Sequence, residues 1–301
     1  MAEQDPVARP ETMPEPVNIT MVTFGRIEFT QRSIDSIAWT AGHPYELTVV
    51  DNASSDGTVE LLHELHARGV VHRLILNPEN MGVAYAANQG WAAGRKAYYL
   101  KVDNDIVFTR PGWLARMVDA CDRLPDAGAL AYNFETTSYP VSIVNGLTVR
   151  PKAGNVGGAC VMIPERIHRR IGYWCEDYRP YSEEDSDMYV RLRHLGLRSY
   201  YMEDEDVGLH LPEGKASPLI GRIGRSVFDE GDPAYRAQKD RWRSRYAGRR
   251  GLRRINQFLY EHGLRPVYIE HRASYRPAIT ARAFVAARFL RFDRWERPPD
   301  L

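Results

Sequence analysis

The sequence predicts an α/β protein, a single Rossmann-like domain with a mostly parallel central sheet, followed by a mainly helical C-terminal extension. From residue 17 to residue 124, short apolar runs alternate with segments of helical spacing. Short strands and turns follow from residue 128, and beyond residue 212 the chain is Arg-rich and mainly helical. Strands that alternate with helices of this length are typical of a doubly wound sheet. We therefore expect one domain over residues 17–214 and a separate extension over residues 215–301.

The first two strand–helix pairs follow directly from the apolar pattern. Residues 18–24 (NITMVTF) form an apolar strand that ends at Gly25, and residues 29–41 then have helical spacing. Residues 45–52 form the second strand, and the Ser/Asp-rich segment after it begins a helix that Gly69 ends.

Two more pairs complete the parallel part of the predicted sheet. Residues 71–77 form the third strand and residues 82–96 an Ala-rich helix. Residues 97–105 form a fourth strand that ends in carboxylates, and residues 111–124 form a further helix. In such sheets ligands bind beyond the carboxyl ends of the strands. The unusual polar residues gather there, namely Thr23, Arg26, Asp51, Asn52, Asn77, Asn80, Asp103 and Asp105.

The later part of the domain has a different pattern. Residues 129–134, 141–151 and 155–164 predict short strands with turns, and residues 182–196 predict a helix. Residues 198–211 predict a strand, an acidic turn and a second strand.

Charge divides the chain into two parts. Residues 215–301 hold 20 of the 40 Lys and Arg residues and 9 of the 39 Asp and Glu residues, which makes this extension net +11. The rest has 20 basic and 30 acidic residues, a net charge of −10, which argues against a nucleic-acid partner for the body. We expect the extension to dock on the acidic body or on a second subunit in a homodimer, or to make peripheral contact with a membrane.

The ends and the cysteines suggest a cytoplasmic protein. Residues 1–16 are rich in Pro and Glu and predict a flexible leader without the apolar stretch of a signal peptide. No run of about 18 apolar residues is present. The cysteines Cys121, Cys160 and Cys175 have no paired spacing, so we expect reduced thiols.

Asp103 and Asp105 are the sharpest chemical signal. They stand on alternate residues after an apolar strand, and carboxylates so placed suit Mg²⁺ or Mn²⁺, which keep coordination sites for substrate phosphates. A polar turn is the structural alternative, but the position at a strand end favours a metal. His210 is a candidate third ligand near such a metal.

The second signal surrounds Asp51, at the end of the second strand, where a carboxylate can accept hydrogen bonds from a base or ribose. We expect the neighbouring Ser54, Ser55 and Asp56 only to cap the next helix. Gly82, after Asn80, allows close backbone approach to a ligand. Asn88, inside the Ala-rich helix, is equally well a buried amide bonded to backbone or a ligand contact.

The third signal is an acidic cluster before the helix at residues 182–196: Glu183, Glu184, Asp185 and Asp187. One of these carboxylates can serve as a general base, with a raised pKa in so crowded a site. The structural alternative is that these carboxylates only form a solvated cap at the start of the helix.

Taken in order, these segments resemble the family-two glycosyltransferases of the GT-A fold, from about Val17 to Gly214. The matching segments are TMVTFGR, VVDNASSDGT, NMGVAYAANQG, DND, GGACVMIP, the series Glu184, Asp185, Asp187, Arg191, Arg193 and Gly196, and His210 to Gly214. The resemblance implies a nucleotide-sugar half over residues 17–110 and an acceptor half over residues 111–214.

The resemblance also implies roles for individual residues. Thr23, Asp51 and Gly82, with Asn80 beside them, would line the nucleoside site. Asp103 would contact ribose or a metal-bound water or serve as a ligand itself. Asp105 and His210 would hold Mn²⁺ or Mg²⁺. Asp185 would be the general base, with Glu184 the alternative. Lys101, unusual before the metal motif, would contact a donor phosphate or sugar, or point to solvent.

The implied reaction is inverting transfer from a nucleotide sugar, with UDP-sugar as the first guess. The acceptor would be a glycan, a lipid-linked sugar or a small natural product. Two alternatives belong to other classes. A sugar-1-phosphate nucleotidyltransferase would need a longer Gly-rich loop after the first strand than Phe24-Gly25-Arg26 provides. A non-catalytic sugar-binding relative would not need DND, Asp185 and His210 together.

Overall fold

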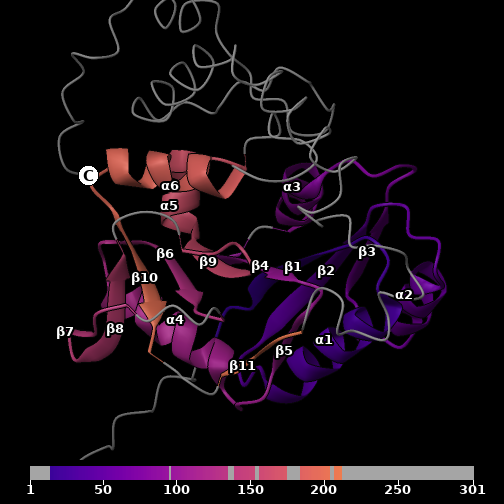
Figure 1. Ribbon diagram of the computed structural model, residues 1–301, viewed down its shortest axis with the longest axis horizontal. Helices are drawn as coiled ribbons and strands as arrows, with labels where there is room; N and C mark the ends of the chain where they lie inside the picture. Colours follow the sequence, from indigo (N-terminus) through magenta and orange to yellow (C-terminus); the bar gives the residue numbers. More distant parts are fainter. Residues whose placement is uncertain are drawn as a thin grey trace, which may run out of the picture.

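The structure is a computed structural model that describes residues 14–94, 96–134, 139–152, 156–174, 184–203 and 207–211. It confirms the predicted α/β class (Figure 1). The strands are β1 (Val17–Thr23), β2 (Tyr45–Asp51), β3 (Arg73–Leu76), β4 (Tyr98–Asp103), β5 (Ile106–Phe108), β6 (Ala127–Tyr132), β7 (Ser142–Val144), β8 (Leu147–Lys152), β9 (Cys160–Pro164), β10 (Arg198–Met202) and β11 (Gly208–His210). The helices are α1 (Ile27–Thr40), α2 (Thr58–Ala67), α3 (Val83–Ala93), α4 (Trp113–Arg123), α5 (Glu165–Ile171) and α6 (Glu184–His194).

Nine strands form one sheet in the order β3-β2-β1-β4-β9-β6-β10-β8-β7. Strands β3, β2, β1 and β4 pair in parallel, and so do β6 and β10. Strand β9 lies antiparallel between β4 and β6, and β8 is antiparallel to both β10 and β7. All strands of this sheet except β8 and β9 therefore point the same way, which confirms a mostly parallel sheet.

Helices cover both faces of this sheet. Helices α1, α2 and α4 lie on one face and α3, α5 and α6 on the other (Figure 1). Successive side chains of β4 point to opposite faces of the sheet. Leu100 and Val102 pack in the core on the α1 side, whereas Tyr99 packs in the core on the α3 side. The side chains of Lys101 and Asp103 alternate with Leu100 and Val102, so they belong to the α3, α5 and α6 face.

The strand register brings the predicted polar residues together. Thr23 of β1 pairs with Asp51 of β2, and Val22 pairs with Asp103 of β4. The carboxyl ends of these three neighbouring strands therefore meet at one edge of the sheet, where ligands of open α/β sheets bind.

Helix α3 packs unusually close to β1. A Cβ atom built on Gly90 would lie 2.2 Å from Cγ2 of Thr20, far inside van der Waals contact. The side-chain amide of Asn18 donates to the carbonyl oxygen of Gly94 at 2.6 Å and to that of Gly90 at 3.3 Å. Glycine at residue 90 thus lets the helix rest on the strand, and this contact fixes the helix that follows Gly82.

Two short elements differ from the sequence prediction. The predicted strand over residues 97–105 ends at Asp103, and the chain turns at Asn104 and Asp105 into β5. Strand β5 pairs antiparallel with β11, so that His210 lies opposite Ile106. Helix α5 was not predicted, because its seven residues are too short for a periodic signal.

Several predictions fall on residues outside the described ranges. These are the leader over residues 1–13, Cys175, Glu183, and the extension over residues 215–301, together with the side chains of Asp187 and Arg191. Within the residues that the structure describes, no helix is both long enough and apolar enough to span a bilayer. Cys121 and Cys160 are buried free thiols.

Candidate active site at the carboxyl edge of the sheet

Asp51 lies at the centre of a polar network between β1 and β2. Its side chain is 1% exposed, and Oδ1 accepts hydrogen bonds from Oγ1 of Thr23 at 2.8 Å and from Oγ of Ser54 at 2.5 Å. Oδ2 accepts from the backbone amide of Ser54 at 2.8 Å. The carboxylate is therefore held rigidly at the strand end, as a group that orients a ligand should be.

The expectation that Ser54 only caps a helix is wrong. Its hydroxyl donates to Asp51 and accepts from the backbone amide of Gly25 at 2.7 Å, so it links the loops after β1 and β2. Asp56 does cap: its Oδ1 accepts from the amide of Thr58 at the start of α2, and its Oδ2 accepts from the amide of Ile27 at the start of α1. This capping holds the two loops in one arrangement.

Gly82 and Asn80 continue this edge of the sheet. Gly82 has φ 86° and ψ 160°, a conformation open essentially to glycine, and its amide donates to Oδ1 of Asn80 at 3.0 Å. Asn52 fixes the same turn, since its side-chain oxygen accepts from Asn77 at 2.9 Å and its amide donates to the carbonyl oxygen of Gly82 at 3.4 Å. The backbone of residues 80–82 is thus brought beside Asp51's strand.

Asn88 has the structural role rather than the ligand-binding one. Its side-chain amide donates to the carbonyl oxygen of Trp174 at 2.9 Å, and its side-chain oxygen accepts from the Trp174 amide at 2.9 Å. This pair of bonds ties α3 to the segment after α5.

Asp105 combines a buried carboxylate with two nitrogen-bearing neighbours, the guanidinium group of Arg26 and the imidazole ring of His210. Nη1 of Arg26 lies 2.7 Å from its Oδ2, and Nε2 of His210 lies 3.4 Å from the same atom. Burial alone would raise the pKa of Asp105, but His210 and Arg26 together hold that pKa below its usual value. The other oxygen, Oδ1, is buried and has no hydrogen-bond partner.

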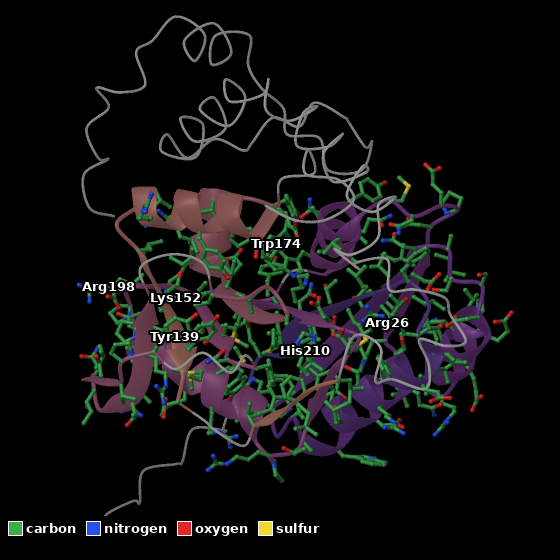
Figure 2. The ribbon with its side chains drawn as sticks, viewed as in Figure 1. Arg26, Tyr139, Lys152, Trp174, Arg198 and His210 are labelled. Carbon is green, nitrogen blue, oxygen red and sulfur yellow. The ribbon has the colours of Figure 1, made fainter. Side chains whose placement is uncertain are left out.

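An unusual backbone conformation places Arg26. It has φ 63° although it is not glycine, and it follows Gly25, which has φ 69°. A non-glycine residue held in this region is strained and tends to occur at functional sites. Arg26 and His210 come from opposite ends of the domain and both lie near the middle of the molecule (Figure 2).

Lys101 and Asp103 form an ion pair beside Asp105, in which Lys101 is buried and the side chain of Asp103 is partly exposed. Lys101 is 4% exposed, which excludes the alternative that it points to solvent. Its ammonium group contacts the Asp103 carboxylate and donates to the carbonyl oxygen of Gly158 at 2.8 Å. Burial raises the pKa of Asp103 above its usual value in spite of the Lys101 charge.

Glu184 and Asp185 begin helix α6, on the same face of the sheet as Lys101. Burial, with the nearby charge of Asp185, raises the pKa of Glu184 to about 7. Its Oε2 is buried without a hydrogen-bond partner. Asp185 is half-buried, and its Cβ lies 3.8 Å from the position that a Cβ on Gly158 would take. Both candidate bases are half-buried and lie at the same place, at the start of α6.

The arrangement fits a divalent ion in part. Among the residues that the structure describes, no three His, Cys, Asp or Glu side chains converge as a complete metal site. Asp105 nevertheless offers a buried oxygen without a partner, and His210 lies beside it, so these two residues supply an oxygen and a nitrogen donor of the kind Mn²⁺ accepts. Asp103 faces Lys101, and its role as a metal ligand stays a prediction.

The sequence placed Arg26 among the polar residues at the strand ends without giving it a partner, and it gave no role to Gly158. Arg26 could have been found from its place after the first strand and a glycine, whereas the Lys101–Gly158 contact joins residues 57 apart and leaves no local signal.

Comparisons with known proteins relate this chain to one protein family and one fold. Residues 18–146 match the family model described as Glycosyl transferase family 2. Uncharacterized proteins of Mycobacterium tuberculosis and Mycobacterium bovis are 28% identical over 112 residues, which is 36% of this chain and 32% of theirs. The chain therefore matches about a third of the length of these curated relatives.

Three solved structures share the fold at low sequence identity. The mannosyltransferase PcManGT from Pyrobaculum calidifontis, in complex with GDP-Man and Mn²⁺, has a TM-score of 0.52 and 17% identity over 82% of this chain and 79% of its own. TarS of S. aureus in complex with UDP has a TM-score of 0.51 and 15% identity over 66% and 61%. GalNAc-T7 with UDP, GalNAc and Mn²⁺ has a TM-score of 0.51 and 12% identity over 64% and 43%.

Proposed function

We propose that the chain transfers a sugar from a nucleoside-diphosphate sugar to an acceptor hydroxyl, and the match of residues 18–146 to the family model described as Glycosyl transferase family 2 supports this proposal. The observation that carries the proposal is the convergence of three groups on one part of the molecule. The Asp51 network and the Asp103–Asp105 motif lie at neighbouring strand ends, and the Glu184–Asp185 pair lies on the sheet face to which Lys101 and Asp103 belong.

The donor would lie along the strand ends. Asp51, fixed by Thr23 and Ser54, suits the base or ribose, and the backbone at Gly82 allows close approach beside it. We propose a UDP-sugar as the first donor to test. The solved structures with the same fold include complexes with UDP and with GDP-Man, so both nucleotides belong in the test.

Asp105 and His210 would hold Mn²⁺ or Mg²⁺, and such an ion neutralises the diphosphate leaving group. Asp185 would take the proton of the acceptor hydroxyl during a single in-line displacement that inverts the anomeric centre. Glu184 is the alternative base, because its raised pKa suits the role and it is half-buried like Asp185, although its Oε2 atom is buried.

The test is a panel of nucleotide sugars offered to the purified chain with Mn²⁺, with thermal shift and nucleotide release as readouts. We expect a specific donor to raise the melting temperature by mass action and to release nucleoside diphosphate. Release of pyrophosphate instead would favour a nucleotidyltransferase. Donor binding with no turnover would favour a non-catalytic relative.

A matched pair of variants tests the metal. Asp105→Ala should abolish turnover, because the diphosphate charge is then left uncompensated. The control is Asp119→Ala, which removes an exposed helix aspartate paired with Arg123. Chelator should stop the wild type, and Mn²⁺ should restore it. Full turnover in excess chelator contradicts metal dependence.

A further inference from the structure

Lys101 is a buried cation at the junction between the donor and acceptor parts of the site. It lies in the middle of β4 on the face that carries Asp103, and it is 4% exposed. An ammonium group withdrawn from water costs free energy unless charged and hydrogen-bonded partners replace the water. Its described partners are the carboxylate of Asp103 and the carbonyl oxygen of Gly158.

These two partners come from different parts of the chain. Asp103 belongs to the predicted nucleotide-sugar half, over residues 17–110. Gly158 precedes β9 and belongs to the acceptor half. One ammonium group therefore connects the metal motif to the backbone on the acceptor side, at 2.8 Å from the Gly158 oxygen.

The backbone at Gly158 also lies next to Asp185, the candidate base. A Cβ on Gly158 would lie 3.8 Å from Cβ of Asp185 and 4.0 Å from Nζ of Lys101, so Asp185 and the ammonium group approach the same residue. The neighbouring Gly157 is fixed as well, because its amide donates to the hydroxyl of Tyr201 at 2.8 Å. Tyr201 is buried in β10, so residues 157–158 are held between a core tyrosine and Lys101.

From this arrangement we propose that Lys101 is a positioning residue that sets the separation between the Asp103–Asp105 motif and the candidate base, and that it does not contact the donor. The proposal rests on the glycosyltransferase function proposed above.

The test compares Lys101→Met with Lys96→Met. Methionine keeps the length and apolar stem of the lysine and removes the charge. Lys96 is the control, because it precedes the same strand and pairs with Glu46 at 2.7 Å, away from the site. Turnover, the dissociation constant for UDP or GDP with Mn²⁺, and the ratio of sugar transfer to donor hydrolysis are measured for each.

We expect Lys101→Met to lower the turnover number at saturating donor by roughly tenfold or more, with the nucleotide dissociation constant changed less than about threefold, since the lost group orders the reacting parts but does not touch the donor. Transfer should fall more than hydrolysis, because water needs less exact placement than an acceptor. Lys101→Arg should recover part of the turnover. Lys96→Met should match the wild type.

Three results would overturn the proposal. A nucleotide dissociation constant weakened tenfold or more with unchanged turnover would make Lys101 a donor ligand. A lower melting temperature with normal turnover of the folded protein would make it only structural, as would failure of both Lys101→Met and Lys101→Gln to fold. The wild-type measurement decides the underlying function separately, since absence of transfer and of hydrolysis with every donor would reject that function itself.

Discussion

At the scale of single residues, the chemistry depends on which carboxylate in α6 is the base. Asp185→Asn keeps size and polarity but cannot accept a proton, so we expect turnover to fall roughly a hundredfold or more with little change in donor affinity. Steady-state kinetics at saturating donor measure this. Glu165→Gln is the control, since Glu165 opens α5 as Glu184 opens α6 and its side chain pairs with surface Arg169.

The companion variant Glu184→Gln identifies the alternative. If Glu184→Gln lowers the turnover number and Asp185→Asn does not, the assignment of the base to Asp185 is wrong by one position. If both variants turn over normally, the site has no enzymic base and a retaining reaction becomes the better mechanism.

From the raised pKa of Glu184 we also predict that the free energy of unfolding depends on pH. Its pKa rises from 4.5 to about 7 on folding, so the folded protein binds the proton more tightly than the unfolded chain. The protonated carboxyl stabilises the fold below pH 4.5, and this contribution is lost as pH rises to about 7, by up to roughly 1.4 kcal/mol per pH unit.

Melting curves of the wild type and Glu184→Gln in chelator should therefore diverge between pH 4.5 and about pH 7, because the amide does not titrate. We expect the variant to become the more stable protein towards the upper end of that range. Two melting temperatures that change in parallel with pH would show that the carboxyl is not buried as described.

The residues of the site differ in how far the sequence predicts them. Asp51, Asp103 and Asp105 follow from one rule, since charges at the ends of parallel strands meet at one edge. Lys101 was recognised as unusual, but its burial depends on Gly158 and could not be derived locally. Ser54 was misread, because a serine before a helix has the same local pattern whether it caps that helix or binds a neighbouring loop.

At the scale of elements, the contact of α3 with β1 is tighter than any apolar pattern indicates. In an open helix position, Gly→Ala stabilises by up to about 1 kcal/mol. At Gly90 the new methyl group would lie 2.2 Å from Cγ2 of Thr20 and 2.9 Å from Cβ of Thr20. Because the Cβ atom of Thr20 does not move when its side chain changes rotamer, such a change cannot remove the overlap. We expect Gly90→Ala to destabilise the fold by roughly 1–3 kcal/mol, measured by urea unfolding.

The double variant Gly90→Ala with Thr20→Ala supplies the control for that contact. Removal of the Thr20 hydroxyl and methyl groups should recover part of the lost stability. If the two substitutions add without coupling, the helix does not rest on Thr20 and the cause lies elsewhere.

Element boundaries were predictable where periodicity was long, as in the segment that became α1. They were wrong at residues 104–108, where the chain turns at Asn104 and Asp105 and forms the short strand β5, and at α5, which is too short for a periodic signal. The pairing of β5 with β11 could not be predicted from the sequence for another reason. It joins Ile106 to His210, about a hundred residues apart, and only tertiary structure brings that histidine to Asp105.

At the scale of the whole molecule, the mostly parallel sheet followed from the alternation of strands and helices, but its continuation did not. Strand β9 reverses direction between β4 and β6 and joins the two parts of the sheet into one. Because Gly158 lies two residues before this strand, the topology of the sheet brings the Gly158 backbone to Lys101. The charge division between body and extension remains a property of the sequence alone.

That division leads to the last prediction, which concerns residues 215–301, outside the described ranges. The segment from residue 279 to residue 292 has helical spacing, with Ile279, Ala283, Ala286 and Leu290 near one face and Arg282 and Arg288 elsewhere. We favour docking of this predicted helix on the net −10 body or on a second subunit over insertion into a membrane surface, because most amphipathic helices face a protein core.

Truncation before Ile279 should then lower the melting temperature or cause aggregation. The full-length chain at low salt should not sediment with anionic vesicles. A stable, monodisperse truncation, combined with full-length protein that binds such vesicles and releases them in high salt, would establish the membrane contact instead, since charge attraction to lipid is screened by salt.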